Sequence, residues 1–292
     1  MPRLRDFRQR IRGVQKTQKI THAMELVAAT RMRRAVASVL ATRRYVELAR
    51  ELLHEVRQRA DVAHHPLLER RSPVRRSLLL VVAGNRGLVG SFHHRLAALA
   101  SAVIAREEVP LHVMTAGRVA ARLVRRFGVH LVADFPKKDL LDQPADAAPI
   151  AEELLRVFLA GEADRVRVVY GDFVSPARQE MVVRTLLPVG EEEAAPALRR
   201  PVARQRPETT FTFEPSPQAV LRAIVPNLLA IQVYQALLET TASEHAARMV
   251  AMRNATDNAQ ELLDELTLTL NRARQQQVTT ELQEMFAGGL AE

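Results

Sequence analysis

The residues of this chain that could do chemistry are gathered in a glycine-rich loop, Gly84–Gly90, with the sequence GNRGLVG. The loop stands between a predicted strand and a predicted helix, and loops in that position bind phosphate because free amides and the helix dipole face the ligand. The spacing is G-x-x-G-x-x-G, however. No Lys-Ser/Thr pair follows Gly90, and no acidic residue ends the next strand to hold a ribose. The loop is therefore a weak candidate for a nucleotide-binding enzyme.

Two pairs of adjacent histidines, His64–His65 and His93–His94, have side chains that could ligate a metal. The first pair stands directly before Pro66 and a short basic linker, Arg70–Arg76, and we interpret both pairs as surface positions. The chain contains no cysteine, which excludes disulfides and thiolate metal sites. The sequence therefore predicts no metal and no cofactor.

Positive charge is concentrated at the start of the chain. Residues 1–60 hold fifteen Lys and Arg against five Asp and Glu, whereas the whole chain of 292 residues has a net charge of +9. A basic helix indicates a nucleic acid, an acidic membrane surface or an acidic protein partner. No helix-turn-helix spacing, zinc pattern or set of stacking aromatics accompanies the charge, which disfavours a nucleic-acid reader.

The C-terminal segment, from about residue 216 to 286, is predicted to be one long helix. After Pro226 it contains no glycine or proline until Gly288. Apolar and small side chains recur at alternating spacings of four and three at Met252, Thr256, Ala259, Leu263, Leu266, Leu270 and Ala273. This heptad pattern is typical of a coiled coil. At 1.5 Å per residue the helix would be about 105 Å long, so it must extend beyond a small domain.

The N-terminal segment, from about residue 3 to 61, is predicted to be a second helix, about 85 Å long. A three-four repeat begins at Leu4, Phe7, Ile11 and Val14 and continues less regularly through Ile20, Met24 and Val27. Each terminal helix has an apolar seam that needs a partner, and antiparallel pairing of the two covers both seams. The expected organisation is an N-terminal helix over residues 1–62, a central domain over 75–214 and a C-terminal helix over 215–292.

The central domain alternates strands and helices, which predicts an α/β fold with a mainly parallel, Rossmann-like sheet. The expected strands are Ser77–Ala83, Leu111–Thr115, Val129–Ala133 and Val166–Tyr170, and the expected helices are Phe92–Arg106, Gly117–Phe127 and Ile150–Ala160. A later extended run, Gln179–Val189, is expected to add an antiparallel strand at the edge, with Thr209–Glu214 as a possible partner. Between them, Glu191–Pro207 is expected to be a surface connector.

Both termini resemble the gamma subunit of F-type ATP synthases. The C-terminal signature of that family is similar to Ser243–Phe286, SEHAARMVAMRNATDNAQELLDELTLTLNRARQQQVTTELQEMF. The N-terminal signature is similar to Arg10–Ala35, RIRGVQKTQKITHAMELVAATRMRRA. The loop at Gly84–Gly90 also resembles the family's own, which usually carries Asp and Cys where Asn85 and Val89 stand here.

The resemblance implies a non-catalytic rotor. In this family the terminal helices form a shaft inside a hexamer of alternating alpha and beta subunits, and the α/β domain lies with the epsilon subunit and the membrane-embedded c-ring. Ion flow turns the ring and the shaft, which moves the catalytic beta subunits through their states of ATP synthesis and hydrolysis. No nucleic acid is an expected partner.

The resemblance also implies roles for particular residues. The rotor–stator contacts it implies are Met24, Arg31, Arg33, Arg248, Arg274 and Gln275. Thr279 and Glu281 match a polar pair that braces the N-terminal helix. Phe211 and Glu214 match the region that meets the c-ring and epsilon.

The expected location is the cytoplasmic face of a bacterial plasma membrane, where the chain is peripheral and attached through the c-ring. No run of about twenty apolar residues is present to cross a bilayer. No signal or transit peptide precedes the first helical pattern, which begins within a few residues of Met1.

Overall fold

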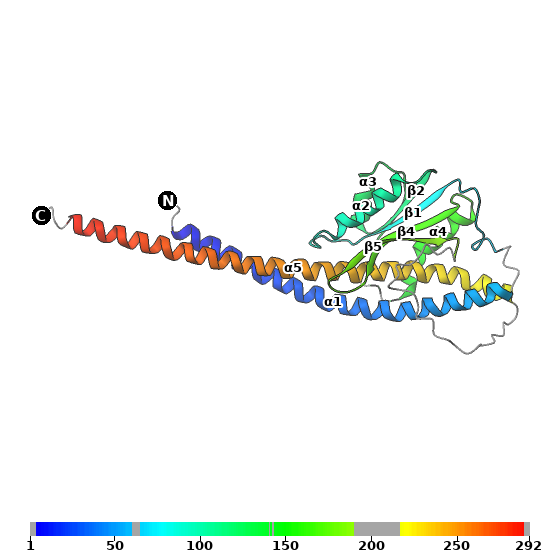
Figure 1. The fold of residues 1–292 in the computed structure, drawn as a ribbon, viewed down its shortest axis with the longest axis horizontal. Coiled ribbons are helices and arrows are strands. Elements are labelled where there is room, and N and C mark those ends of the chain that lie inside the picture. Colours follow the sequence, from blue (N-terminus) through cyan, green and yellow to red (C-terminus); the bar gives the residue numbers. More distant parts are fainter. Residues whose placement is uncertain (1–3, 60–64, 140, 142, 190–216, 289–292) are drawn as a thin grey trace. The chain divides into compact units, whose positions relative to one another are not determined.

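The fold of this chain is given by a computed structural model that describes residues 4–59, 65–139, 141, 143–189 and 217–288. The chain divides into two compact units. The first contains residues 1–29 and 248–292, and the second contains residues 30–247. Two long helices, α1 (Leu4–Arg59, 56 residues) and α5 (Pro217–Gly288, 72 residues), contribute to both units (Figure 1). At 1.5 Å per residue these helices are about 84 and about 108 Å long, as the sequence predicted.

The first unit is an antiparallel pair made by the ends of α1 and α5. Every position of the predicted α5 seam, from Met252 to Ala273, is buried or half-buried, whereas most neighbouring residues are exposed. Hydrogen bonds join the helices between the Thr21 and Thr256 hydroxyls (2.8 Å) and from the Gln18 amide to Gln260 (2.8 Å). The heptad interpretation of α5 is confirmed.

The α1 seam differs from the sequence prediction after Val14. Ile20 and Val27, which were assigned to the seam, are 51% and 53% exposed. The three-four repeat instead continues without a break through buried or half-buried positions, most of which have polar or small side chains: Gln18, Thr21, Glu25, Ala28, Met32, Ala35 and Val39. The prediction was wrong because it followed apolar side chains, while the helix pair buries polar ones that find partners across the seam.

The second unit is built on a five-stranded sheet in the order β3-β2-β1-β4-β5. The strands are β1 (Ser77–Val82), β2 (Leu111–Ala116), β3 (Leu131–Phe135), β4 (Arg165–Phe173) and β5 (Gln179–Leu187). The first four are mutually parallel and β5 pairs antiparallel with β4 at the edge. The predicted mainly parallel α/β sheet with an antiparallel edge strand is confirmed, while Thr209–Glu214 lies outside the described residues.

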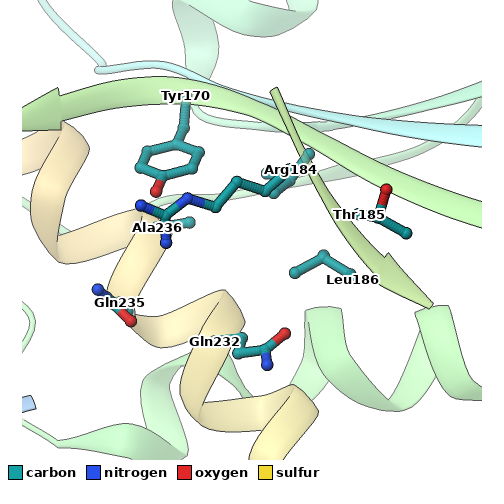
Figure 2. Close-up of a pocket in the computed structure, with 8 residues that line it drawn as sticks. Tyr170, Arg184, Thr185, Leu186, Gln232, Gln235 and Ala236 are labelled. Carbon is teal, nitrogen blue, oxygen red and sulfur yellow. The ribbon is translucent and has the colours of Figure 1, made fainter. Parts of the chain in front are cut away.

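Three helices connect the parallel strands, namely α2 (Phe92–Ala105), α3 (Arg118–Arg125) and α4 (Ala148–Leu159), the last preceded by a short 3-10 turn, η2 (Pro144–Ala147). The helices α2 and α3 pack on one face of the sheet, where Leu79, Val81 and Val169 meet Leu96 and Val124. Side chains alternate along a strand, so the neighbouring residues of β4 point to the opposite face. There Val168 and Tyr170 lie close to α5 (Figure 2).

One stretch of α5 is more apolar than the sequence analysis allowed for. Within Ala219–Gln283 an 18-residue window reaches a mean hydropathy of 1.4, enough by length and composition for a membrane span, although half of that window is buried within the protein. Leu228, Leu229 and Val233 on this stretch are fully buried. Core helices of soluble proteins pass the same test, and we interpret the run as the side of α5 that packs inside the second unit.

Candidate functional site

The glycine-rich loop Gly84–Gly90 follows β1 and is held by hydrogen bonds to neighbouring loops. The Asn85 side-chain amide donates to the Lys137 carbonyl (2.7 Å) and to Asp139 (2.9 Å). The Gly84 carbonyl accepts from the backbone N–H of Val119 at the start of α3 (3.0 Å). The polar groups of the loop are thus engaged with the ends of β3 and α3.

Asp139 carries the charge that holds this loop arrangement together. The hydrogen bond from Asn85, aided by the positive charges of Arg86, Lys137 and Arg31, lowers the pKa of Asp139 against the opposing effect of burial. Arg86 also forms an ion pair with Asp139 at 3.0 Å. Arg31, predicted as a rotor–stator contact, therefore lies close enough to Asp139 within the second unit to affect it electrostatically.

The place where a phosphate would sit against Gly84 is filled by the chain itself. A β-carbon added at Gly84 would fall on the carboxylate of Glu244, a buried residue of α5. In doubly wound folds a ligand binds in the crevice beyond the carboxyl ends of the strands, where the strand order reverses. Here that point lies between β1 and β4. Because Glu244 occupies it, the geometry gives no support to the nucleotide-enzyme interpretation.

A cavity between α5 and the sheet edge is too small for a ligand. It measures about 20 Å³ and is lined by side chains that include Tyr170, Arg184, Gln232 and Gln235 (Figure 2). The guanidinium of Arg184 lies over the ring of Tyr170 at 5.6 Å. Such a volume holds about one water molecule. Among the residues that the structure describes, no group of His, Asp or Glu could hold a metal ion.

The candidate residues suited to bind a partner lie on the helix pair of the first unit. Met24 is half-buried beside the α1 seam, and three apolar neighbours on α1 are exposed: Ile20, Leu26 and Val27. Arg274 and Gln275 are exposed on α5. Exposed apolar side chains on a helix that is already paired indicate a further contact surface.

The end of α5 extends past α1. The pairs Thr21–Thr256 and Gln18–Gln260 fix a register that places Leu4, the first described residue of α1, near Ala273. Residues 274–288 therefore form an overhang, about 22 Å long, that Figure 1 shows beyond the start of α1 at Leu4. Val278, Leu282 and Met285 are exposed there and recur at the i, i+4, i+7 spacing of one helix face.

Thr279 and Glu281 lie on this overhang, so the structure does not bring them to α1. The Thr279 hydroxyl donates to the Gln275 carbonyl (2.9 Å), and Glu281 accepts from Gln277 (2.8 Å), both within α5. The expected bracing pair is thus separated from α1 by the register of the helices. Phe211 and Glu214, expected to meet the c-ring, lie outside the described residues.

Arg33 and Arg248 have contrasting surroundings. Arg33 is exposed, and its guanidinium donates to the Thr30 hydroxyl (3.5 Å). Arg248 is 8% exposed, so it has little surface to offer a partner subunit. The rotor–stator roles of these residues stay predictions.

Sequence reasoning missed a buried charged cluster in the second unit. Arg43 of α1 donates through Nε to Glu239 of α5 (2.9 Å) and through Nη2 to the Phe173 carbonyl (2.9 Å), and Asp172 lies 3.7 Å away. Glu239 and Asp172 are almost fully buried. Nothing in the local sequence reveals the cluster, because its members are separated by more than sixty residues. The one available signal is a glutamate, Glu239, just after the most apolar stretch of α5.

The match to a family model and the similarity to curated relatives both indicate the same family. The family model described as ATP synthase matches residues 3–291. The ATP synthase gamma chain of Roseiflexus castenholzii is 40% identical over 295 residues, covering 100% of this chain and 99% of the relative. The ATP synthase gamma chain of Moorella thermoacetica is 38% identical, covering 99% of this chain and 98% of the relative.

Solved structures share the fold. A chain from the rotor of the Euglena gracilis mitochondrial ATP synthase has a TM-score of 0.63 and 17% identity, covering 94% of this chain and 98% of that one. A chain from an OSCP/F1/c-ring structure of the same synthase has a TM-score of 0.67 and 18% identity, covering 99% and 94%. With full-length identity near 40% to bacterial relatives, the chain belongs to the ATP synthase gamma chain family.

Proposed function

We propose that this chain is the non-catalytic central-stalk rotor of a bacterial F-type ATP synthase. The helix pair of the first unit enters the hexamer of alpha and beta subunits, and the α/β domain meets the epsilon subunit and the c-ring. Ion flow turns the c-ring and with it this chain, so each catalytic beta subunit passes through its binding and release states in turn. The complex places the chain peripherally, at the cytoplasmic face of the plasma membrane.

One observation in particular supports this function, namely the helix pair that ends in an overhang with exposed apolar side chains. Val278, Leu282 and Met285 face outward on α5, and no part of α1 that the structure describes reaches them. An exposed apolar stripe on one helix face is stabilised when a partner encloses it. A sleeve formed by a surrounding hexamer would enclose it while still allowing the helix to turn.

Torque would pass mainly through the bulk of the helix pair. An exposed ion pair contributes about 0–1 kcal/mol and is screened by salt, so Arg33 and Arg274 could not drive the beta subunits alone. A stiff pair of helices that presses side chains such as Met24 against them would favour one beta conformation at each angle. The charged contacts would then tune the register.

The test is reconstitution of the complex with single-molecule rotation. This chain is co-expressed with the alpha and beta subunits of the same organism, and a probe is attached at the exposed Ala177→Cys position. We expect one copy of the chain per hexamer and stepwise rotation of the probe during ATP hydrolysis. A chain that fails to co-purify with the hexamer, or a probe that stays still during ATP turnover, would overturn the rotor function.

A further inference from the structure

The most heavily buried part of α5 is unusually polar. Residues 233–246 are all buried, and they enclose eight side chains with polar or charged groups: Tyr234, Gln235, Glu239, Thr240, Thr241, Ser243, Glu244 and His245. Burial of a polar group costs free energy unless it is hydrogen-bonded, and apolar side chains of similar size would pack at least as well. Their presence on four turns of helix indicates a requirement beyond stability. We call residues 233–246 the buried joint.

The joint is fastened to α1 and to the sheet through Glu239. This carboxylate is 0% exposed and accepts hydrogen bonds from Arg43 Nε and from Gln235, each at 2.9 Å. Arg43 reaches on to β4, where it donates to the Phe173 carbonyl at 2.9 Å. One guanidinium therefore joins α1, α5 and β4, and its planar set of donors fixes their relative orientation.

A second fastening lies two residues further along α5, at Thr241. The buried Lys137, beyond the end of β3, donates to the Thr241 hydroxyl at 2.7 Å. Two glycines lie beside α5, namely Gly84 in the loop after β1 and Gly171 in β4, where the ring of Phe92 is the nearest neighbour. Glu244 fills the space beside Gly84, and Ser243 lies 3.5 Å from the position of a β-carbon at Gly171. The joint thus occupies the crevice in which other proteins of this fold class bind a ligand.

The two fastenings differ in kind from apolar packing. Apolar contact is non-directional, so a helix can turn about its axis and recover much of it in a new register. A buried hydrogen bond to a charged group depends on distance and angle, and leaving the charge without its partner is costly. Rotation of α5 by a single residue, 100° on the helix, would break both the Arg43–Glu239 and the Lys137–Thr241 contacts.

We propose that the buried joint locks α1 and α5 against the sheet, so that torque passes between the α/β domain and the two helices without slip, with Arg43, Glu239 and Lys137 as the positioning residues. This role rests on the proposed rotor function. In this proposal α5 occupies the crevice of the sheet, where other proteins of this fold class bind a nucleotide.

The first experiment removes both members of the Arg43–Glu239 ion pair at once. Arg43→Met alone would leave Glu239 buried and uncompensated and could prevent folding, whereas Arg43→Met with Glu239→Met exchanges the pair for apolar side chains of similar size. We expect the double variant to assemble into the reconstituted complex. Uncoupled ATP turnover under an ion gradient should rise about tenfold, because the loss of one hydrogen bond to a charged group corresponds to about that factor. Arg44→Met with Glu261→Met makes the same exchange at exposed positions and should leave coupling unchanged.

The second experiment measures the lock in the isolated chain, independently of rotor function. Because the native chain has no cysteine, Leu40→Cys on α1 and Ala98→Cys on α2 supply the only two thiols for spin labels. Pulsed electron paramagnetic resonance should give one narrow distance distribution in the native background and a broader one in the Arg43/Glu239 double variant. Unchanged distance distributions in the double variant, together with unchanged coupling of ATP turnover to ion flow, would overturn the proposed locking role of the buried joint. Failure of the native chain to rotate, with the broadening present, would instead overturn the proposed function alone.

Discussion

Glu239 is the side chain whose protonation is most altered by the fold. Burial by itself would raise the pKa of this carboxyl, but a hydrogen bond shared with Asp172 and the charges of Arg43 and Arg184 outweigh it and lower the pKa to about 2, from 4.5. A carboxyl whose pKa is lowered on folding stabilises the native state above its unfolded pKa. That contribution is lost as the pH falls from about 4.5 to about 2.

We therefore expect Glu239→Gln to reduce the free energy of unfolding at pH 7 by an amount on the order of 3 kcal/mol, since one pKa unit corresponds to about 1.4 kcal/mol. The difference between native and variant should shrink as the pH falls from about 4.5 to about 2. Urea unfolding at a series of pH values measures it, with the exposed Glu261→Gln as control. A difference that stays constant across this pH range would show that the charge of Glu239 contributes nothing.

Met24 gives a second prediction at the scale of one residue. Because it is half-buried at the edge of the α1 seam, a lysine there can extend its charged end into solvent without disrupting the helix pair. We expect Met24→Lys to assemble normally but to lower the number of ions pumped per ATP hydrolysed, while Met24→Leu retains native coupling. Unchanged coupling in the lysine variant would remove Met24 from the contact with the beta subunits.

At the scale of elements, the helix pair is held in register by polar seam residues. Each threonine hydroxyl has one proton, and the structure offers it two acceptors. Thr21 can donate to Thr256 (2.8 Å) or to the Gln18 carbonyl (3.0 Å), and Thr256 can donate to the Met252 carbonyl (2.9 Å). One hydroxyl therefore donates across the seam while the other donates back along its own helix.

This arrangement predicts a small coupling energy between the two threonines. Thr21→Val and Thr256→Val should each lower the free energy of unfolding by about 1 kcal/mol, and the double variant should cost less than the sum, because no hydroxyl is then left without its partner. Thermal unfolding of all four chains gives the double-mutant cycle. Additive effects would mean that the hydroxyls do not interact across the seam.

The elements also show what sequence reasoning can reach. All five strands and five of the helices were predicted to within a few residues, because each has a local period or a flanking glycine or proline. The prediction wrongly assigned Ile20 and Val27 to the α1 seam. The polar seam residues Gln18 and Thr21 can be recognised only when their hydrogen-bond partners on α5 are known. Arg43 and Glu239 stand 196 positions apart, so no local pattern could pair them.

At the scale of the whole molecule, the family and the helical ends followed from the sequence, whereas the occupant of the sheet crevice did not. The glycine loop at Gly84–Gly90 looks locally like a phosphate cradle. Only the tertiary structure brings Glu244 into the space beside Gly84. The overhang of α5 likewise depends on the register between helices rather than on either helix alone, and it leads to the last prediction.

Replacing Val278, Leu282 and Met285 by alanine should leave the isolated chain as stable as before, because these side chains are exposed and Met285 is 73% exposed. If the alpha and beta subunits enclose the overhang, the same variant should bind them at least about tenfold more weakly, since burial of one large apolar side chain contributes about 1.5–3 kcal/mol. The matched control replaces Arg272, Gln276 and Thr280, exposed polar residues on another side of the same helix, by alanine. Dissociation rates of the reconstituted complexes, together with the thermal midpoints of the isolated chains, separate the two effects. Equal dissociation rates for the apolar and polar triple variants would mean that the alpha and beta subunits do not enclose the apolar side chains of the overhang.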